Sequence, residues 1–138
     1  MVAAARPPAG FLPIQSNSAF GWENGPIFHK NDADRYLRGF RVAERHINAG
    51  GICHGGMVMT FADVLLASAA LQLVAPPLVT VRLATDFIGP AYLDEWVEGE
   101  AGADLLEDGL IALKGSIWTA RRTVATASGL FKKIGRRL

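Results

Sequence analysis

The chain has 138 residues, of which half are hydrophobic and a fifth are charged. These proportions suit one globular domain and exclude an intrinsically disordered chain. Its 14 Lys and Arg residues nearly balance its 13 Asp and Glu residues, so we expect no broad basic face for nucleic acid.

Residues 1–25 are rich in Pro, Gly, Asn and Ala and show weak periodicity, which predicts a loose N-terminal arm with one short turn of helix. We assign residues 26–138 to a single domain. The arm lacks the continuous apolar run of a secretory signal, and Cys53 is the only cysteine, so we expect a cytoplasmic protein. Residues 27–47 suit one or two strands, with a turn at residues 31–34.

Residues 57–74 form the strongest single pattern in the sequence, because only four of them are polar and none is Gly or Pro. The abundance of Ala, Leu and Met predicts a helix that is apolar nearly all round. Asp63 near its middle would cost a few kcal/mol in lipid, and no flanking Lys or Arg supports insertion. We therefore expect a helix wrapped by protein and no association with a membrane.

Residues 79–87 alternate apolar and polar side chains, as a half-buried strand does. Residues 95–105, 110–119 and 123–132 are further strand candidates, separated by segments short enough for hairpins. One long helix followed by about four antiparallel strands predicts an α+β fold, with the sheet curled around a central helix.

The start of the predicted helix carries the chemically informative residues. Gly55 and Gly56 leave the first N–H groups of the helix uncovered, at the positive end of its dipole. A carbonyl oxygen that gains negative charge would be stabilised there, although an ordinary glycine-rich start of a helix has the same sequence. Asp63 is a carboxylate in an apolar helix, so it must be neutral, paired, functional or turned to solvent.

Eight residues separate Gly55 from Asp63, which corresponds to about 12 Å along a helix axis. One reacting carbonyl carbon cannot lie about 3 Å from both ends of that span. If both residues act on one substrate, Asp63 must come from one subunit and the glycine N–H from its partner, across a two-fold axis. We therefore expect a homodimer with two equivalent sites.

The spacing Asn-x5-His-Gly-Gly-x6-Asp from Asn48 to Asp63, with residues 79–81 and 87–91, resembles a known family. It is similar to the hotdog-fold acyl-CoA thioesterases of the phenylacetic acid degradation type, over roughly residues 40–131. The resemblance implies a hotdog fold, a curved antiparallel sheet around one long helix. It also implies hydrolysis of acyl-CoA to a free acid and CoA, without a cofactor, in dimers that pair further into tetramers.

The resemblance also assigns roles to individual residues. Asp63 would activate water or attack the thioester carbonyl, and the backbone N–H of Gly55 would polarise that carbonyl. Asn48 would orient the water or the thioester, His54 would support the loop, and Thr80 would hydrogen-bond the attacking water. We expect the substrate to be contacted by Gly56 and Phe87, and the CoA phosphates by a basic cluster that also suits a solvated edge: Arg121, Arg122, Lys132 and Lys133.

Several alternatives stay open from the sequence. Cys53 next to His54 suggests a Cys–His nucleophile, although adjacent residues in an extended segment point to opposite faces. The domain could bind acyl-CoA without turnover, or act on an acyl carrier protein. A hydratase would be expected to carry a His at position 68, which is Ser. The three histidines lack ligand spacing, so we expect no metal.

Overall fold

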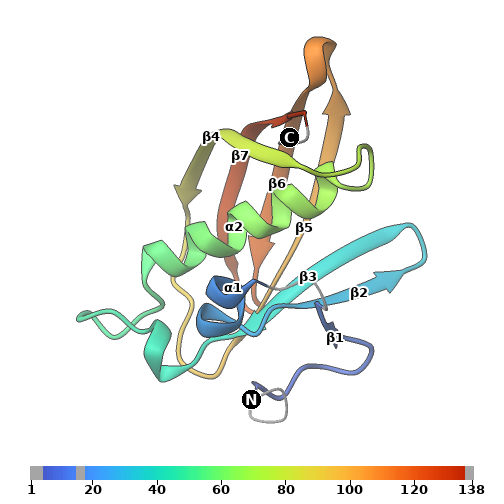
Figure 1. Ribbon diagram of the computed structural model, residues 1–138. Coiled ribbons are helices and arrows are strands. Elements are labelled where there is room, and N and C mark those ends of the chain that lie inside the picture. Colours follow the sequence, from blue (N-terminus) through green and yellow to red (C-terminus); the bar gives the residue numbers. More distant parts are fainter. Residues whose placement is uncertain (1–4, 15–17, 136–138) are drawn as a thin grey trace.

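The computed structural model describes residues 5–14 and 18–135, and in them one antiparallel sheet curls around one long helix (Figure 1). The long helix is α2 (Gly55–Ala70), and the short α1 (Ala19–Asn24) lies beside it. The strands in chain order are β1 (Leu12–Pro13), β2 (Phe28–Asp32), β3 (Arg35–Arg41), β4 (Leu78–Phe87), β5 (Trp96–Leu105), β6 (Leu110–Trp118) and β7 (Thr123–Lys133). Two 3-10 turns, η2 (Glu44–His46) and η3 (Glu107–Gly109), complete the described elements. The predicted α+β arrangement is confirmed.

The helix α2 starts two residues earlier and ends four residues earlier than the sequence pattern predicts. It starts early because His54 caps it: the Nδ1 atom of His54 accepts a hydrogen bond from the Gly56 N–H at 2.7 Å. It ends at Ala70, and the chain continues through turn residues 71–73 to Pro76 and Pro77, which cannot continue a helix. Within the described residues, no helix is long and apolar enough to cross a membrane.

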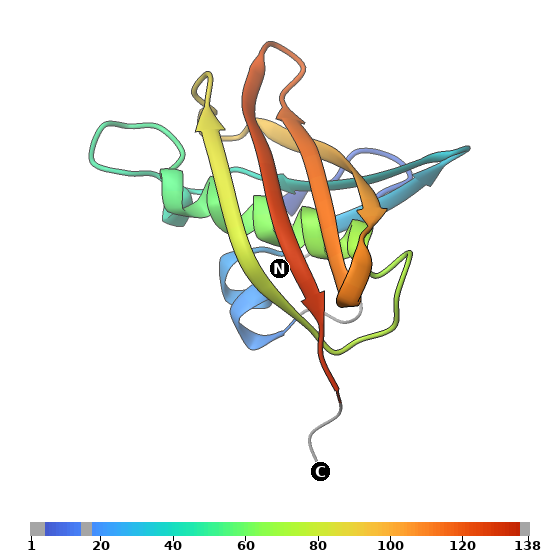
Figure 2. The ribbon, with the colours of Figure 1, turned by 90° about the horizontal axis from the view of Figure 1, so that it is seen from above.

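One face of α2 forms the centre of the hydrophobic core. Figure 2 shows β4, β7 and β6 curving across one side of the helix. The buried helix positions recur at the three- and four-residue spacing that keeps side chains on one face. They are Met57, Val58, Phe61, Ala62, Leu65, Leu66, Ala69 and Ala70. This packing fixes the helix, and therefore Gly55 and Asp63, against the sheet.

The strand order in the sheet is β1-β2-β3-β5-β6-β7-β4, so β4 does not lie beside β5, which follows it in the chain. The predicted hairpins β5–β6 and β6–β7 are confirmed by their registers. Pairing of β4 with β7 was not predicted, because an alternating pattern identifies a strand but not its partner.

The strand β4 is the edge of the sheet and exposes apolar side chains. Val79, Val81 and Phe87 are 41%, 54% and 55% exposed. Within the described residues, β4 pairs with β7 on one side and with no strand on the other. An apolar edge strand of ten residues is the kind of surface that native proteins cover.

The described part of the predicted N-terminal arm adds β1 and α1 to this frame. Leu12 and Pro13 pair with β2, and Phe11 is buried with its ring 5.0 Å from that of Trp96. The division between an arm at residues 1–25 and a domain at residues 26–138 stays a prediction.

Gly39 in β3 must be glycine, because a Cβ atom there would lie 2.4 Å from the ring of Trp96. We expect Gly39→Ala to lower the free energy of unfolding by about 1–3 kcal/mol, since the indole must shift in a packed cluster. Denaturant unfolding measures the loss. Gly102→Ala is the matched control, because a Cβ at Gly102 meets nothing within 4 Å. Equal stability of the two variants would contradict this packing.

Candidate active site

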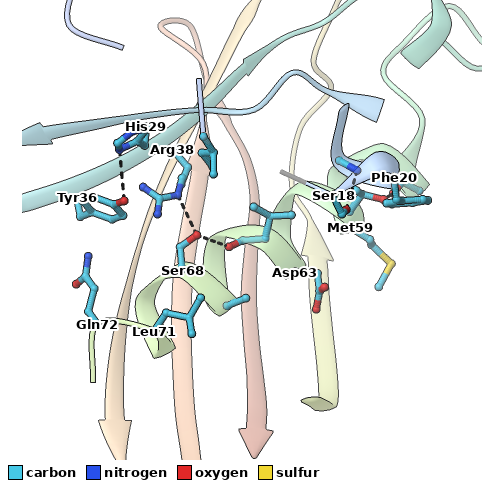
Figure 3. Close-up of a pocket in the computed structure, with 16 residues that line it drawn as sticks. Ser18, Phe20, His29, Tyr36, Arg38, Met59, Asp63, Ser68, Leu71 and Gln72 are labelled. Atoms are coloured by element: carbon cyan, nitrogen blue, oxygen red, sulfur yellow. Dashed lines mark hydrogen bonds between the residues drawn. The ribbon is translucent and has the colours of Figure 1, made fainter. Parts of the chain in front are cut away.

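A groove of about 910 Å³ runs along the face of α2 that is turned away from the core. We call it the Asp63 groove. Residues of α1, β2 and β3 form its other walls, among them Phe20, His29, Tyr36 and Arg38 (Figure 3). The helix contributes Gly56, Thr60, Asp63, Val64, Ala67 and Ser68. The groove explains why the helix is apolar nearly all round: one face packs against the sheet, and the opposite face lines the groove.

Asp63 is half-buried and held by a neighbouring strand. Its Oδ1 atom accepts a hydrogen bond from the Thr80 hydroxyl of β4 at 2.8 Å. Thr80 lies at a β-bulge, where the register of β4 against β7 shifts. The structure thus brings together two residues to which the sequence assigned related roles, and Thr80 fixes the orientation of the carboxylate. Asp63 also lines the groove, and its carboxylate has acceptor sites beyond the one that Thr80 occupies.

Asn48 builds the loop before α2. Its Oδ1 atom accepts hydrogen bonds from the N–H groups of Gly50 at 2.9 Å and Ile52 at 3.2 Å, and its own N–H donates to the Ile52 carbonyl at 2.8 Å. The side-chain carbonyl is therefore committed to the loop. The Asn48 amide NH2 donates to no acceptor among the described residues, so it is the part of the side chain that can serve a ligand.

The start of α2 offers one free donor rather than two. The Gly56 N–H is already bonded to the His54 ring, and a Cβ at Gly56 would lie 2.9 Å from that ring. The Gly55 N–H donates to no acceptor within residues 5–14 and 18–135, as expected for the first turn of a helix. The exposed ring of Phe87 lies over Gly55, about 3.6 Å from where a Cβ would stand.

The buried His46 stabilises the loop that precedes α2. Its Nδ1 atom accepts from the Ala43 N–H at 2.9 Å, and its Nε2–H donates to the Asn24 carbonyl at 2.6 Å. Burial lowers the pKa of His46, which suits a neutral ring with one donor and one acceptor nitrogen. The His46 carbonyl also accepts from the His54 N–H at 2.7 Å, so this histidine has a structural role.

Within one chain, the residues assigned to the site divide between two hollows. Asn48, Gly55 and Phe87 line a pocket of about 520 Å³, which we call the glycine-loop pocket. Asp63 and Gly56 line the Asp63 groove. Asp63 is tied to Thr80 near one end of β4, whereas Gly55 lies against Phe87 at the other end. A single chain therefore does not bring the carboxylate to the free N–H.

The four basic residues assigned to CoA do not form one cluster. Arg121 and Arg122 precede β7, and Lys132 and Lys133 end it, about 33 Å away at the rise of an extended strand. The Nη1 atom of Arg122 donates to Glu95 at 2.7 Å and to the Pro90 carbonyl at 2.9 Å. Of the remaining three basic residues, Lys133 donates a hydrogen bond to the Ala75 carbonyl at 2.6 Å. Arg121 and Lys132 are the members left for a ligand.

Arg38 is the most unusual polar residue in the groove, and its sequence pattern did not single it out. Arg38 is only 5% exposed, its Nε–H donates to the Ser68 hydroxyl at 2.9 Å, and its guanidinium lies 3.7 Å from the centre of the Tyr36 ring. An Arg in a strand normally suggests a solvent-facing position. The available signal was its spacing: Phe40, two residues later, faces α2 in the core, and residues two apart share a face.

Comparison with known proteins agrees with this fold. The family model described as the Thioesterase superfamily matches residues 50–126. The Pseudomonas aeruginosa protein PA0474, which has a provisional esterase name, is 38% identical over 127 residues, covering 90% of this chain and 95% of that protein.

Solved structures of low sequence identity share the architecture. The phenylacetic acid degradation protein PaaI of E. coli superposes with a TM-score of 0.73 at 22% identity, covering 86% of each chain. The BH2602 protein of Bacillus halodurans, solved with CoA, superposes with a TM-score of 0.80 at 18% identity, covering 90% of this chain and 83% of that one. The hotdog fold implied by the sequence resemblance is thus confirmed. The chain belongs to the Thioesterase superfamily and is a thioester hydrolase with a hotdog fold.

Proposed function

We propose that the protein hydrolyses acyl-CoA thioesters in a site that two copies of the chain build together. Asp63 of one subunit would meet the Gly55 N–H of the other. The observation that carries this proposal is the placement of the two residues at opposite ends of β4.

The exposed edge of β4 supplies the means of assembly. Antiparallel pairing of β4 with its own copy about a two-fold axis would set the Thr80 end of one strand beside the Phe87 end of the other. Asp63 of one subunit would then face the glycine-loop pocket of its partner. The same pairing would satisfy the unpaired edge and cover Val79, Val81 and Phe87.

The chemistry needs a base, a nucleophilic water and a polarised carbonyl. Asp63, oriented by Thr80, would take a proton from water while that water attacks the thioester carbon. The Gly55 N–H would stabilise the negative charge that develops on the carbonyl oxygen, and the Asn48 amide would hold the thioester or the water. The C–S bond then breaks, and the proton passes to the departing CoA thiolate. Direct attack by the Asp63 carboxylate is the alternative first step.

The same pairing would place basic residues near the CoA phosphates. Arg121 lies at the Phe87 end of the sheet and Lys132 at the Thr80 end, since Lys132 pairs with Val79 and Thr123 lies beside Gly89. Two ends that are far apart in one chain would meet across the two-fold axis. Charge-assisted contacts to phosphate favour CoA over an uncharged thiol. The structure of BH2602 with CoA supports this choice of carrier.

Two rival functions differ in what they require. A protein that only binds acyl-CoA has no need for a carboxylate oriented by a hydroxyl group, so the Asp63–Thr80 pair favours turnover. Hydrolysis of acyl groups on a carrier protein would use the same residues. Comparing the rates of hydrolysis of one acyl group on CoA and on a carrier protein distinguishes a thioesterase for acyl-CoA from one for the carrier protein. We propose a cytoplasmic location, since Cys53 is the single cysteine.

We expect Asp63→Asn to lower kcat/KM for hydrolysis of a panel of acyl-CoA thioesters by about 10²- to 10⁴-fold, because the variant removes the base. Asparagine keeps the shape and an acceptor for Thr80. Release of free CoA thiol measures the rate. Asp104→Asn, an exposed carboxylate of β5, is the matched control and should leave the rate unchanged. Undiminished hydrolysis by Asp63→Asn would overturn the proposal.

Cys53 is not expected to act as a nucleophile. It is buried, burial raises its pKa to about 11, and the His54 Nδ1 atom is occupied by the Gly56 N–H. Because the thiol stays protonated at neutral pH, we expect iodoacetamide to modify Cys53 on the order of 100-fold more slowly in the native protein than in the unfolded chain. Mass spectrometry follows the modification. Cys53→Ala should retain hydrolysis. Loss of hydrolysis in Cys53→Ala, together with fast modification of Cys53 in the native protein, would support the Cys–His mechanism instead.

A further inference from the structure

Arg38 lies at the inner wall of the Asp63 groove with part of its guanidinium unsatisfied. Figure 3 shows it reaching from β3 toward Ser68 of α2, with Tyr36 beside it and Asp63 further along the helix. Its Nε–H is bonded to Ser68, but the buried Nη1 atom has no hydrogen-bond partner among the described residues. A buried donor without a partner destabilises the folded protein, and more so when the donor is charged.

No carboxylate among the described residues forms an ion pair with Arg38. Burial lowers the pKa of Arg38, but a guanidinium stays protonated in proteins. The groups that face it are the neutral ring of Tyr36 and His29, whose pKa is lowered by burial and by the charge of Arg38. Among the described residues that line the groove, Asp63 alone has a carboxylate, and it is bonded to Thr80.

We propose that Arg38 binds a carboxylate at the far end of the acyl group, so that the enzyme prefers thioesters of dicarboxylic acids. This inference rests on the proposed function, because it takes Asp63 as the site of the reacting carbonyl. A carboxylate offers the planar pair of acceptors that matches the guanidinium fork.

The geometry of the groove sets the length of such an acyl group. Ser68, which holds Arg38, lies five residues after Asp63, or about 7.5 Å along the axis of α2. Val64 and Ala67 line the groove between them and offer an apolar floor for methylene groups. A short dicarboxylic acyl chain, of which the glutaryl group is the probe, would span from the carbonyl near Asp63 to Arg38.

The test compares glutaryl-CoA with its neutral isostere, in which an isopropyl group replaces the carboxylate. We expect the wild-type protein to favour glutaryl-CoA in kcat/KM, and Arg38→Met to lower that preference by about 10- to 100-fold. Arg35→Met is the matched control: Arg35 lies on the same strand, is exposed and pairs with Glu100 outside the groove, so its loss should leave the preference intact.

Wild-type preference for the neutral ester, or an unchanged preference in a folded Arg38→Met, would overturn the inference. If Arg38→Met does not fold, the wild-type comparison still decides. Calorimetric binding of free glutarate to the wild type separates this inference from the proposed function. Binding of glutarate without hydrolysis of either ester would contradict only the proposed function. Hydrolysis of the neutral ester without binding of glutarate would contradict only the role of Arg38.

Discussion

The rigid spacing between Gly55 and Asp63 on α2 is the constraint on which the proposed function depends. The helix is locked by one buried face against the concave sheet, so neither residue can move toward the other without disrupting the core. The strand β4 imposes the same separation as α2, because Asp63 is bonded to Thr80 near one end of β4 and Gly55 lies against Phe87 at the other end. Asp63 can therefore meet a Gly55 N–H only if that N–H belongs to another copy of the chain.

The two faces of α2 divide the work of stability and recognition. The face toward the sheet is buried and apolar, whereas the opposite face combines apolar side chains with small and polar ones such as Gly56, Thr60 and Ser68. Small residues on the helix leave volume for a ligand, and the walls from α1, β2 and β3 close that volume from the other side. The N-terminal segment thus lines the groove through Phe20 of α1, although its sequence predicts only a loose arm with one short turn of helix.

Much of the fold could be predicted, because it depends on local patterns. The apolar run predicts α2, the alternation predicts β4, and three further strand candidates with short separators predict β5 to β7 and their hairpins. Long-range pairing could not be predicted: nothing local to Leu12 indicates β2, and nothing in β4 indicates β7 as its partner.

Prediction of the site succeeded and failed for similar reasons. The sequence linked Asp63 to Thr80 through the family resemblance, and the structure places their side chains in contact. It grouped four basic residues because they are close in the chain, but one pair precedes and the other ends an extended strand of eleven residues. It passed over Arg38, since the direction of a strand side chain depends on which face the core covers. Its partner Ser68 is thirty positions away.

Mixing two inactive variants tests most directly whether the site is shared between subunits. Gly55→Pro removes the N–H and should keep the helix, since proline suits the first helical position and His54, with ψ of 135°, already has the conformation favoured before proline. The added Cβ would meet Phe87 at about 3.6 Å, an ordinary contact distance. Combined by unfolding and refolding with Asp63→Asn, it should regain about a quarter of wild-type activity, because half of the random dimers contain one intact site. Activity that stays at the level of the separate variants would contradict a shared site.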